Sequence, residues 1–334
     1  MEEKITLAHG AGGEQTAQLI DRVFKNYFDS PLLTSDDAAY LPAQGARLAM
    51  STDGFIVSPP FFSGGNIGKL SVCGTVNDLS CMGAKPLYLT AACVIEEGFL
   101  LADLEKIAAA MAKTAKEAGV QIVAGDTKVA AKGQVDKIFI TTTGIGAVLP
   151  GVSLGGAQAH PGDAVIVTGD IGRHGCCILL ERDDFGISAD VESDCAPLWD
   201  AAEAALGASS SVHVIRDATR GGVGTVLYEI AAQSGTGIVV QREQVPVQPA
   251  VSGVCSLLGL DPMYLACEGR MVMIVPGEDA EAVLEAVRRT ACGADAVIIG
   301  SVTADYPGRV IMETAIGTKT ILPKPAGELL PRIC

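Results

Sequence analysis

The amino-acid sequence predicts an α+β fold built from two domains. Its 334 residues are more than one average hydrophobic core organises, so two domains of ordinary size are expected. Hydrophobic residues make up 49% of the chain and charged residues 19%, a balance that provides large cores and disfavours disorder. Strand-like and helix-like segments are mixed, but hairpin-like pairs interrupt strict alternation. That order favours α+β domains over a doubly wound parallel sheet.

In the first half of the chain, a glycine turn at 9–13 precedes an expected helix over 14–28. A second helix, with apolar residues at 101, 104, 107, 108 and 111 on one face, is closed by Gly119. The other expected elements are a helix over 67–82 and strands over 47–51, 87–95, 121–124 and 138–142. Glycines and a proline between 149 and 156 then mark a domain boundary.

In the second half, strands and helices continue to mix. The expected strands are 164–168, 212–215, 263–266, 271–275, 296–300 and 310–313, and the expected helices are 198–205, 222–233, 251–258 and 279–290. We therefore divide the chain into an N-terminal segment (1–34), an N-terminal domain (35–152), a C-terminal domain (153–315) and a flexible tail (316–334).

Composition argues against several classes of function. The net charge is −15, from 24 basic and 39 acidic residues, whereas nucleic acid or an anionic membrane would require a basic face. The sequence has no signal-peptide pattern and no apolar run of membrane-spanning length, so we expect a soluble, cytoplasmic protein. Ten cysteines without C-x-x-C spacing and only four histidines argue against a zinc or iron site.

Aspartates recur where a strand or loop is expected to give way to glycine or to a helix. At such positions a carboxylate can face a shared cleft, and Mg²⁺ takes oxygen ligands that link carboxylates to phosphates. Neighbouring glycines would let backbone N–H groups approach a phosphate closely. Each aspartate alone is also compatible with a turn or a cap. Together they predict a Mg–nucleotide site with Asp36, Asp37, Asp53, Asp78, Asp126 and Asp217.

The common nucleotide motifs are absent. From Gly64 to Lys69 the glycine spacing is one residue short of a Walker A loop, and Leu70 stands where that loop needs Ser or Thr. No G-x-G-x-x-G follows an expected strand and opens a helix. A bound nucleotide would therefore lie in the cleft of another fold.

Two ionisable residues that follow expected strands are candidate proton acceptors. Glu268 in a partly dehydrated cleft would be tuned toward a neutral pKa. A turn carboxylate paired with Arg270 is the alternative interpretation of Glu268. Lys128, which trails the Asp126 turn, is the second candidate.

The final residue, Cys334, ends a segment unlike the rest of the chain. Two glycines and two prolines between 317 and 330 indicate an extended arm. Fully extended, such an arm would reach roughly 40–60 Å, at about 3.3–3.6 Å per residue. A thiol at its end can be carried into a pocket like a substrate. Position alone does not separate this hypothesis from a frayed end with an incidental cysteine.

These motifs together resemble the HypE family of hydrogenase maturation proteins. That family belongs to the superfamily of ATP-binding enzymes that includes aminoimidazole ribonucleotide synthetase and selenophosphate synthetase. Arg173 and Ala218 depart from the family pattern, which has an acidic residue and a proline there. The resemblance runs from near residue 5 to the last residue, and the stretches that carry it are 9–13, 36–39, 52–55, 61–70, 74–79, 125–129, 216–222, 266–269 and 331–334.

The resemblance implies an aminoimidazole ribonucleotide synthetase-like fold, with an N-terminal sheet that pairs across a homodimer and a larger α+β C-terminal domain. It implies ATP in the N-terminal domain, near the dimer interface, with Mg²⁺ held by the aspartates. The implied nucleotide-binding residues are Asp37, Asp53, Gly64, Gly65, Lys69, Asn77, Asp78, Asp126, Thr127 and Asp217.

The resemblance also implies a reaction on the protein's own tail. A carbamoyltransferase, HypF, would place a carboxamide on Cys334, and ATP would drive its dehydration to a thiocyanate. Glu268 is the first choice of base for this step and Lys128 the second. The cyano group would pass to iron on a HypC–HypD complex during assembly of nickel–iron hydrogenase.

Two rival functions are weighed against this one. A selenophosphate synthetase should carry a reactive Cys or selenocysteine in its N-terminal arm, whereas the first cysteine here is Cys73, in an expected helix. A small-molecule kinase of the same superfamily is a related alternative. The other rival is a non-catalytic, ATP-gated scaffold whose tail docks a partner. Covalent modification of Cys334 separates the scaffold from the enzyme.

Overall fold

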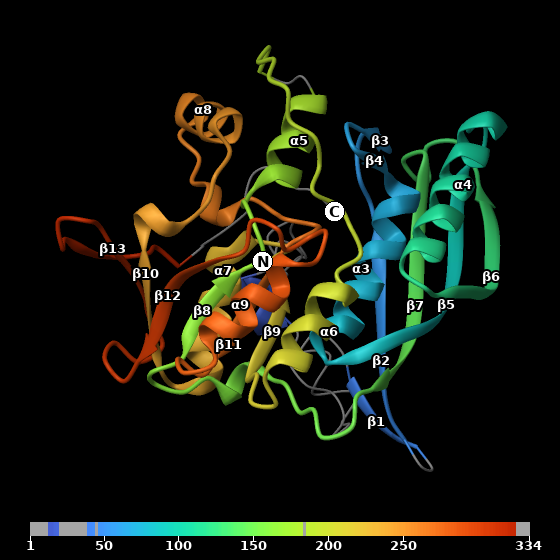
Figure 1. Ribbon diagram of the computed structural model, residues 1–334. Coiled ribbons are helices and arrows are strands. Elements are labelled where there is room, and N and C mark those ends of the chain that lie inside the picture. The colour runs from blue at the N-terminus through green and yellow to red at the C-terminus, as the bar shows by residue number, and fades with distance from the viewer. Residues whose placement is uncertain (1–12, 20–38, 44–45, 183–184, 325–334) are drawn as a thin grey trace, which may run out of the picture.

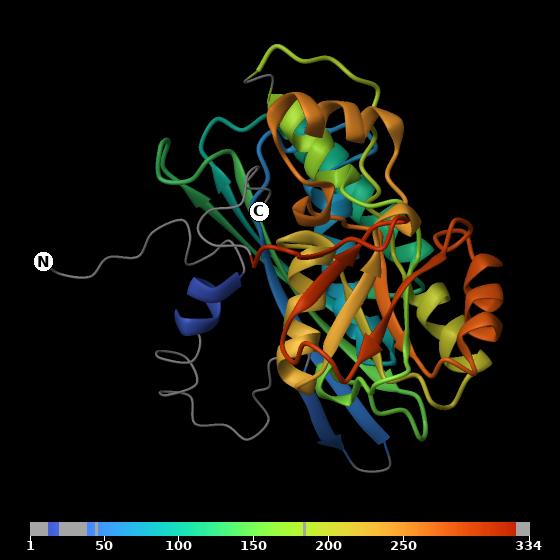
Figure 2. The same ribbon diagram turned by 90° about the vertical axis from the view of Figure 1, so that its left-hand side faces the viewer.

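A computed structural model describes residues 13–19, 39–43, 46–182 and 185–324, which form two halves that each contain a β-sheet (Figure 1). The predicted α+β class is confirmed, because both sheets are mainly antiparallel and are covered by helices. Helix α1 (Gly13–Leu19) lies beside this body (Figure 2), with Glu14 Oε2 4.0 Å from Lys324 Nζ. Within these residues no helix combines the length and apolar character needed to cross a membrane.

The N-terminal half contains a five-stranded sheet. Across it lie β1 (Ala39–Ala43), β2 (Ala46–Phe55), β7 (Ile138–Val148), β5 (Ala84–Glu96) and β6 (Gln121–Ala130). Only the β5–β6 pair is parallel among these pairs. A short hairpin, β3 (Phe61–Phe62) and β4 (Gly65–Asn66), leads into α3 (Ile67–Cys81), and α4 (Leu101–Glu117) follows β5. Both long helices pack on one face of the sheet.

Helix α3 is the central element, because 13 of its 15 residues are buried and only Lys69 and Asp78 are partly exposed. Small residues permit this burial. A Cβ added at Gly68 would lie 2.4 Å from a backbone oxygen of α4, and one at Gly74 would lie 2.7 Å from the Phe55 ring. The helix therefore approaches its neighbours more closely than larger side chains allow, and it also contacts the C-terminal half.

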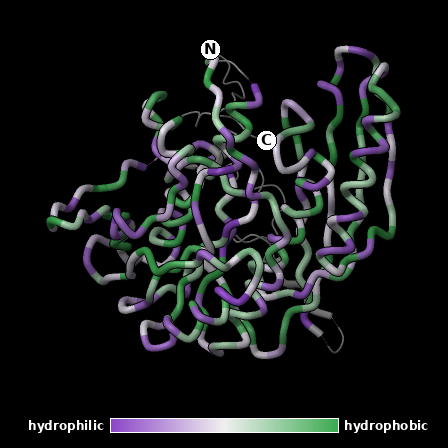
Figure 3. The backbone as a smooth tube through the Cα atoms, turned by 45° about the horizontal axis from the view of Figure 1, so that its top comes forward, coloured by the Kyte–Doolittle hydropathy of each residue, from purple (hydrophilic) through white to green (hydrophobic). Residues whose placement is uncertain are grey.

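The C-terminal half contains a seven-stranded sheet. Across it lie β14 (Lys319–Ile321), β13 (Val310–Glu313), β10 (Gly237–Gln241), β12 (Val297–Thr303), β8 (Ala164–Val167), β11 (Met271–Val275) and β9 (Val214–Asp217). Helix α7 (Gly222–Ser234) covers one face, and α6 (Trp199–Ala208) and α9 (Ala280–Arg288) cover the other. Because both faces are covered, β8 and β11 are apolar at every position. Elsewhere hydrophobic and hydrophilic residues alternate along much of the backbone (Figure 3).

Two further helices, α5 (Arg173–Arg182) and α8 (Pro249–Leu258), pack together at the top of the view in Figure 1. From residue 185 to α6 the chain has no regular secondary structure. The last part of this connection, residues 191–198, is largely buried between the two halves, and we call it the strap.

Most expected elements are present, with several differences. The expected strand over 263–266 is wrong, because Pro262–Tyr264 forms a 3-10 helix in which Asp261 Oδ1 accepts the Met263 N–H at 3.0 Å. Strand β6 continues to Ala130 instead of ending at 124, so Asp126 lies within a strand, and β2 continues to Phe55. Helix α5 and the strands β1, β3, β4, β10 and β14 were not expected. The part of the expected N-terminal helix beyond Leu19 lies outside the described residues.

Candidate active site

Glu268 lies in the loop that leads into β11, and its side chain is only 4% exposed. Burial raises its pKa well above the ordinary value, and the neighbouring Cys195 and Asp217 add to the effect. Arg270, its alternative partner, instead forms an ion pair with Asp170, with Nη2 2.6 Å from Oδ1. A buried carboxyl with a raised pKa is suited to exchanging protons near neutral pH.

Asp53 on β2 and Asp78 on α3 meet where the helix packs on the sheet. Their carboxyl groups share a hydrogen bond, and Asp78 also accepts one from Ser51 Oγ. Burial raises the pKa of Asp53, while the charge of Arg220 and the bond to Asp78 lower it. Two carboxyls in contact share one proton, and both ionise only when a cation lies between them. The pair therefore has the donor chemistry of a Mg²⁺ site.

A metal ion at Asp53 and Asp78 would need further ligands from the nucleotide or from water. Among residues 13–19, 39–43, 46–182 and 185–324, no group of three or more His, Cys, Asp or Glu side chains is arranged to hold a metal. Mg²⁺ is commonly held by one or two carboxylates with phosphate and water oxygens as its other ligands. The two aspartates fit that pattern.

Asp217 ends β9 and is 6% exposed, directly beside the Glu268 loop. The Ala218 N–H donates to the Arg270 carbonyl at 3.1 Å, and the Cys267 N–H donates to the Ala218 carbonyl at 2.9 Å. A proline at position 218 could not donate the first of these bonds. These bonds tie the Asp217 turn to the loop on both sides of Glu268.

Asn77 is bound entirely to backbone groups of the C-terminal half. Its Oδ1 accepts the Leu198 N–H at 2.9 Å, and its Nδ2 donates to the carbonyls of Ala196 at 3.1 Å and Glu268 at 3.4 Å. The side chain is 1% exposed. In this structure Asn77 therefore fixes the strap and the Glu268 loop, and its contact with a nucleotide stays a prediction.

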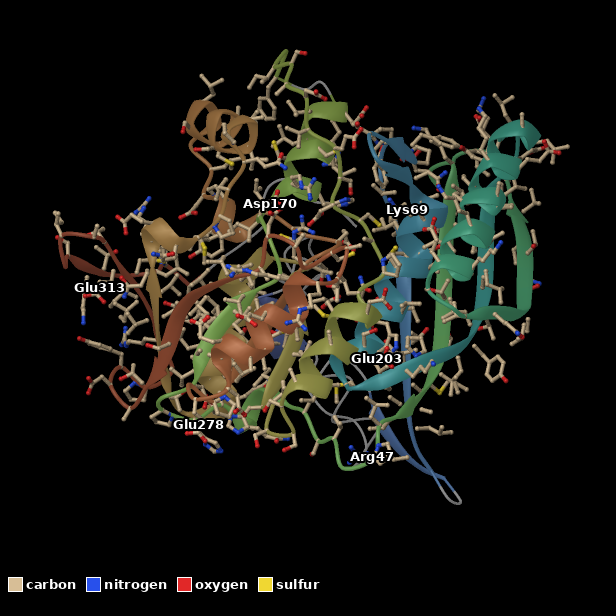
Figure 4. All side chains as sticks on the ribbon, in the orientation of Figure 1. Arg47, Lys69, Asp170, Glu203, Glu278 and Glu313 are labelled. Atoms are coloured by element: carbon tan, nitrogen blue, oxygen red, sulfur yellow. The ribbon has the colours of Figure 1, made fainter. Side chains whose placement is uncertain are left out.

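Lys69, Gly64 and Gly65 lie near the opposite end of α3 from Asp78 (Lys69 is labelled in Figure 4). Nine residues of helix correspond to about 13 Å at 1.5 Å per residue. Lys69 Nζ donates to the Gly64 carbonyl at 2.9 Å, and Gly64 has a φ of +85° that favours glycine. This group is separate from the carboxylates but lies along the same helix.

Asp126, Thr127 and Lys128 lie on the exposed edge strand β6, away from Glu268. Lys128 Nζ is 2.9 Å from Asp126 Oδ2, and its hydrogen bond lowers the pKa of that carboxyl. Strand β6 is three strand spacings from β2, roughly 14 Å. By register Asp126 is in line with Gly54, so it faces the side of the sheet opposite Asp53.

Comparison with known proteins decides the family. A family model described as the N-terminal domain of AIR synthase related proteins matches residues 35–148, and the corresponding C-terminal model matches residues 160–313. A carbamoyl dehydratase HypE of Rhodobacter capsulatus is 46% identical over 337 residues, which cover 100% of this chain and 99% of the relative. The chain belongs to the HypE family.

Solved HypE structures show the same fold. A HypE–HypF complex matches with a TM-score of 0.88 at 46% identity, over 92% of this chain and 99% of that one. HypE in complex with ATP matches with a TM-score of 0.83 at 46% identity, over 99% of this chain and 100% of that one. The expected aminoimidazole ribonucleotide synthetase-like fold is therefore confirmed.

Within this HypE fold, the predicted residues separate into groups. One site gathers the carboxyl groups of Asp53, Asp78, Asp217 and Glu268. Asn77 lies beside this site and is bonded to the strap and the Glu268 loop. Lys69, Gly64 and Gly65 lie at the α3 N-terminus, and Asp126, Thr127 and Lys128 lie on the β6 edge. Asp36, Asp37 and Cys334 lie outside the described residues. Sequence reasoning missed the strap, whose buried Asp194 contacts the Glu268 loop, because its residues show no periodicity or motif.

Proposed function

We propose that this protein uses ATP to dehydrate a carboxamide on its own Cys334 to a thiocyanate, and so supplies cyanide ligands for the iron of nickel–iron hydrogenase. The observation that carries the proposal is Glu268, a buried carboxyl of raised pKa beside the Asp53–Asp78 pair. The HypE membership of the chain supports it, since its relative is a carbamoyl dehydratase and a similar structure holds ATP.

The chemistry requires an oxygen to leave as phosphate, because an amide oxygen is a poor leaving group. The carboxamide oxygen attacks the γ-phosphoryl group of ATP and releases ADP, and Glu268 accepts one N–H proton in this step. Cleavage of the carbon–oxygen bond then releases phosphate, which carries away the second N–H proton. The nitrogen lone pair completes the triple bond. Lys128 is the alternative base.

Asp53 and Asp78 would hold Mg²⁺, with Asp217 as a further ligand candidate, and Asp36, Asp37 and Asp126 complete the proposed set. The ion would offset the negative charge of the nucleotide phosphates. Lys69 with Gly64 and Gly65 would bind phosphates at the other end of α3. An extended nucleotide suits two anchor points on one helix.

A homodimer is supported by the uncovered side of the N-terminal sheet. Nine of the ten residues of β6 are exposed, and Met50 on β2, which is in register with Ile145 and Tyr88, is 41% exposed. Tyr88 on β5 is 49% exposed on the side opposite the helices. A second copy of this sheet would cover these apolar side chains. Asp126 and Lys128 would then lie at the dimer interface and face the partner subunit.

The base of the tail is anchored near the Glu268 loop. The hydroxyl of Tyr264 donates to the Pro323 carbonyl, and that of Tyr228 donates to the Leu322 carbonyl. Tyr264 is four residues from Glu268, at most about 14 Å along the chain. The ten residues beyond Lys324 span up to roughly 36 Å when extended. That length is sufficient for Cys334 to reach Glu268 of its own subunit.

The proposed partners follow from the chemistry of the tail. HypF would donate the carboxamide, in keeping with the similar HypE–HypF complex, and a HypC–HypD complex would accept the cyano group. We propose that the protein acts with these partners in the cytoplasm.

Intact-mass spectrometry of the full chain tests the proposal. With the carbamoyl-donating partner, the tail peptide should gain one carboxamide, and with ATP it should then lose the mass of one water. Cys334→Ala should show neither change and retain ATP binding. Glu268→Gln should gain the carboxamide without losing water. If the wild-type protein binds ATP but an active donor never modifies its tail, the non-catalytic scaffold would be favoured.

A further inference from the structure

The strap passes through the interface between the two halves, and its backbone packs directly against a glycine on each side. A Cβ added at Gly64 would lie 3.0 Å from the Ser193 carbonyl oxygen. One added at Gly269 would lie 1.8 Å from the Asp194 carbonyl oxygen. Both flanking residues are glycines, so the strap is clamped between the turn before α3 and the loop that carries Glu268.

Hydrogen bonds fix the strap on its N-terminal side. The Ser193 N–H donates to the Ser63 carbonyl at 2.9 Å, and Ser193 Oγ is 2.7 Å from His174 Nδ1. The same Oγ accepts the Cys195 N–H at 3.1 Å. Because His174 is fully buried and burial lowers its pKa to about 3, its ring stays neutral and this anchor does not change near neutral pH.

The next residue of the strap, Asp194, holds the backbone of Glu268. Its Oδ1 accepts the Glu268 N–H at 3.1 Å. The Glu268 carbonyl accepts from Asn77 Nδ2 and from the Ala196 N–H, both at 3.4 Å. The backbone of Glu268 is therefore held at its amide and at its carbonyl, which limits the directions its carboxyl can take.

Burial of the Asp194 carboxyl lowers the stability of the fold, so a purely stabilising role does not explain this residue. It is 5% exposed, and its Oδ2 has no hydrogen-bond partner within the described part of the chain. A buried carboxyl oxygen left without a partner destabilises a fold. Arg270 and Arg173 partly offset its charge, while Asp170 opposes them. A buried residue with this penalty, bonded to the candidate base, is best explained by a role at that base.

We propose that Asp194 is a positioning residue for Glu268: its Oδ1 accepts the Glu268 N–H and so fixes the peptide from which the Glu268 carboxyl projects. This inference rests on the proposed function of Glu268. The other groups that act on Glu268 are Cys195, Asp217 and Asp53. Asp194 is distinct from these because it alone, among the residues described, is bonded to the Glu268 N–H.

Amide hydrogen exchange of the full chain, without ATP or partner, tests the contact itself. Asp194→Ala removes the acceptor, so exchange in the peptide that contains Glu268 should accelerate by at least about tenfold, as expected for loss of one buried hydrogen bond of about 1.4 kcal/mol. Asp194→Asn keeps an oxygen acceptor and should restore most of the protection. Glu192→Gln, an exposed strap variant, is the matched control. Equal exchange in Asp194→Ala and wild type would overturn the proposal.

Single-turnover dehydration of the carbamoylated tail tests the consequence. Asp194→Ala should lower the rate about tenfold or more with an unchanged KM for ATP. Asp194→Asn keeps an oxygen acceptor for the Glu268 N–H and should retain most of the wild-type rate, and Glu192→Gln should retain all of it. A wild-type rate in Asp194→Ala would overturn the proposal. Glu268→Gln tests the proposed function separately, since full activity in that variant removes Glu268 as the base.

Discussion

Replacement of Asn77 by alanine tests whether this side chain is structural. The change removes three hydrogen bonds. The Leu198 N–H donates to Asn77 Oδ1 at 2.9 Å, and Asn77 Nδ2 donates to the Ala196 and Glu268 carbonyls at 3.1 and 3.4 Å. At about 1 kcal/mol for each, with the buried Leu198 N–H left unpaired, the loss is about 3 kcal/mol. For 334 residues the entropy of unfolding is about 0.7 kcal/mol per K, so Tm should fall by about 4 °C.

Thermal unfolding measured by calorimetry or circular dichroism provides the assay. Ser80→Ala is a matched control, because Ser80 is also fully buried on α3 but bonds only to the Val76 carbonyl of its own helix, at 2.7 Å. That control should cost about 0.5 kcal/mol. The reasoning is refuted if Asn77→Ala unfolds within about 1 °C of Ser80→Ala. An unchanged Tm with lost ATP affinity would instead support Asn77 as a nucleotide ligand.

Three other variants test the site. Burial raises the pKa of Glu268, so the unfolded chain ionises this group at lower pH than the folded protein, and stability falls as pH rises above the ordinary carboxyl range. The difference in free energy of unfolding between Glu268→Gln and wild type should therefore shift in favour of the variant from about pH 4 to about pH 8, as measured by urea titrations. An equal difference at the two pH values would contradict this. Gly269→Ala should lower the free energy of unfolding by about 1–3 kcal/mol or more, because the added Cβ clashes with the strap. The control Gly253→Ala lies in α8 with nothing within 4 Å of the added Cβ, and it should raise the free energy of unfolding by about 0.5–1 kcal/mol. Similar denaturation midpoints for the two variants would argue against the clamp. Asp78→Asn should weaken Mg²⁺-dependent ATP turnover about ten- to a hundredfold, and unchanged Mg²⁺ titrations would remove Asp78 from the metal site.

Local patterns predicted most of the elements because each carries its own periodicity. The strand at Met271–Val275 is a continuous apolar run, and the helix at Ile67–Cys81 begins at Asn66, whose Oδ1 caps the Gly68 and Lys69 N–H groups. Strand β6 was shortened in prediction because Gly125 and Asp126 are typical of turns. Pairing with β5 on one side keeps that exposed segment extended.

The candidate site could be predicted only in part. Glu268 and Asp217 were identified because each follows an expected strand, and both lie in one buried site. The sequence could not distinguish Asp126 from these, although the register places it three strands away on the opposite side of the sheet. Side-chain direction and strand order depend on pairing between distant segments, which no local pattern encodes.

By itself, the sequence determined the α+β class, most helices and strands, the carboxylates from which the site is built, and the family to which the chain belongs. These properties depend on residue type and local spacing. The tertiary structure alone decided which carboxylates meet, that Arg270 pairs with Asp170 instead of Glu268, and that the strap brings Asp194 to the Glu268 N–H. The last two of these contacts join residues 100 and 74 positions apart, and burial at the interface of the two halves gives them their chemistry.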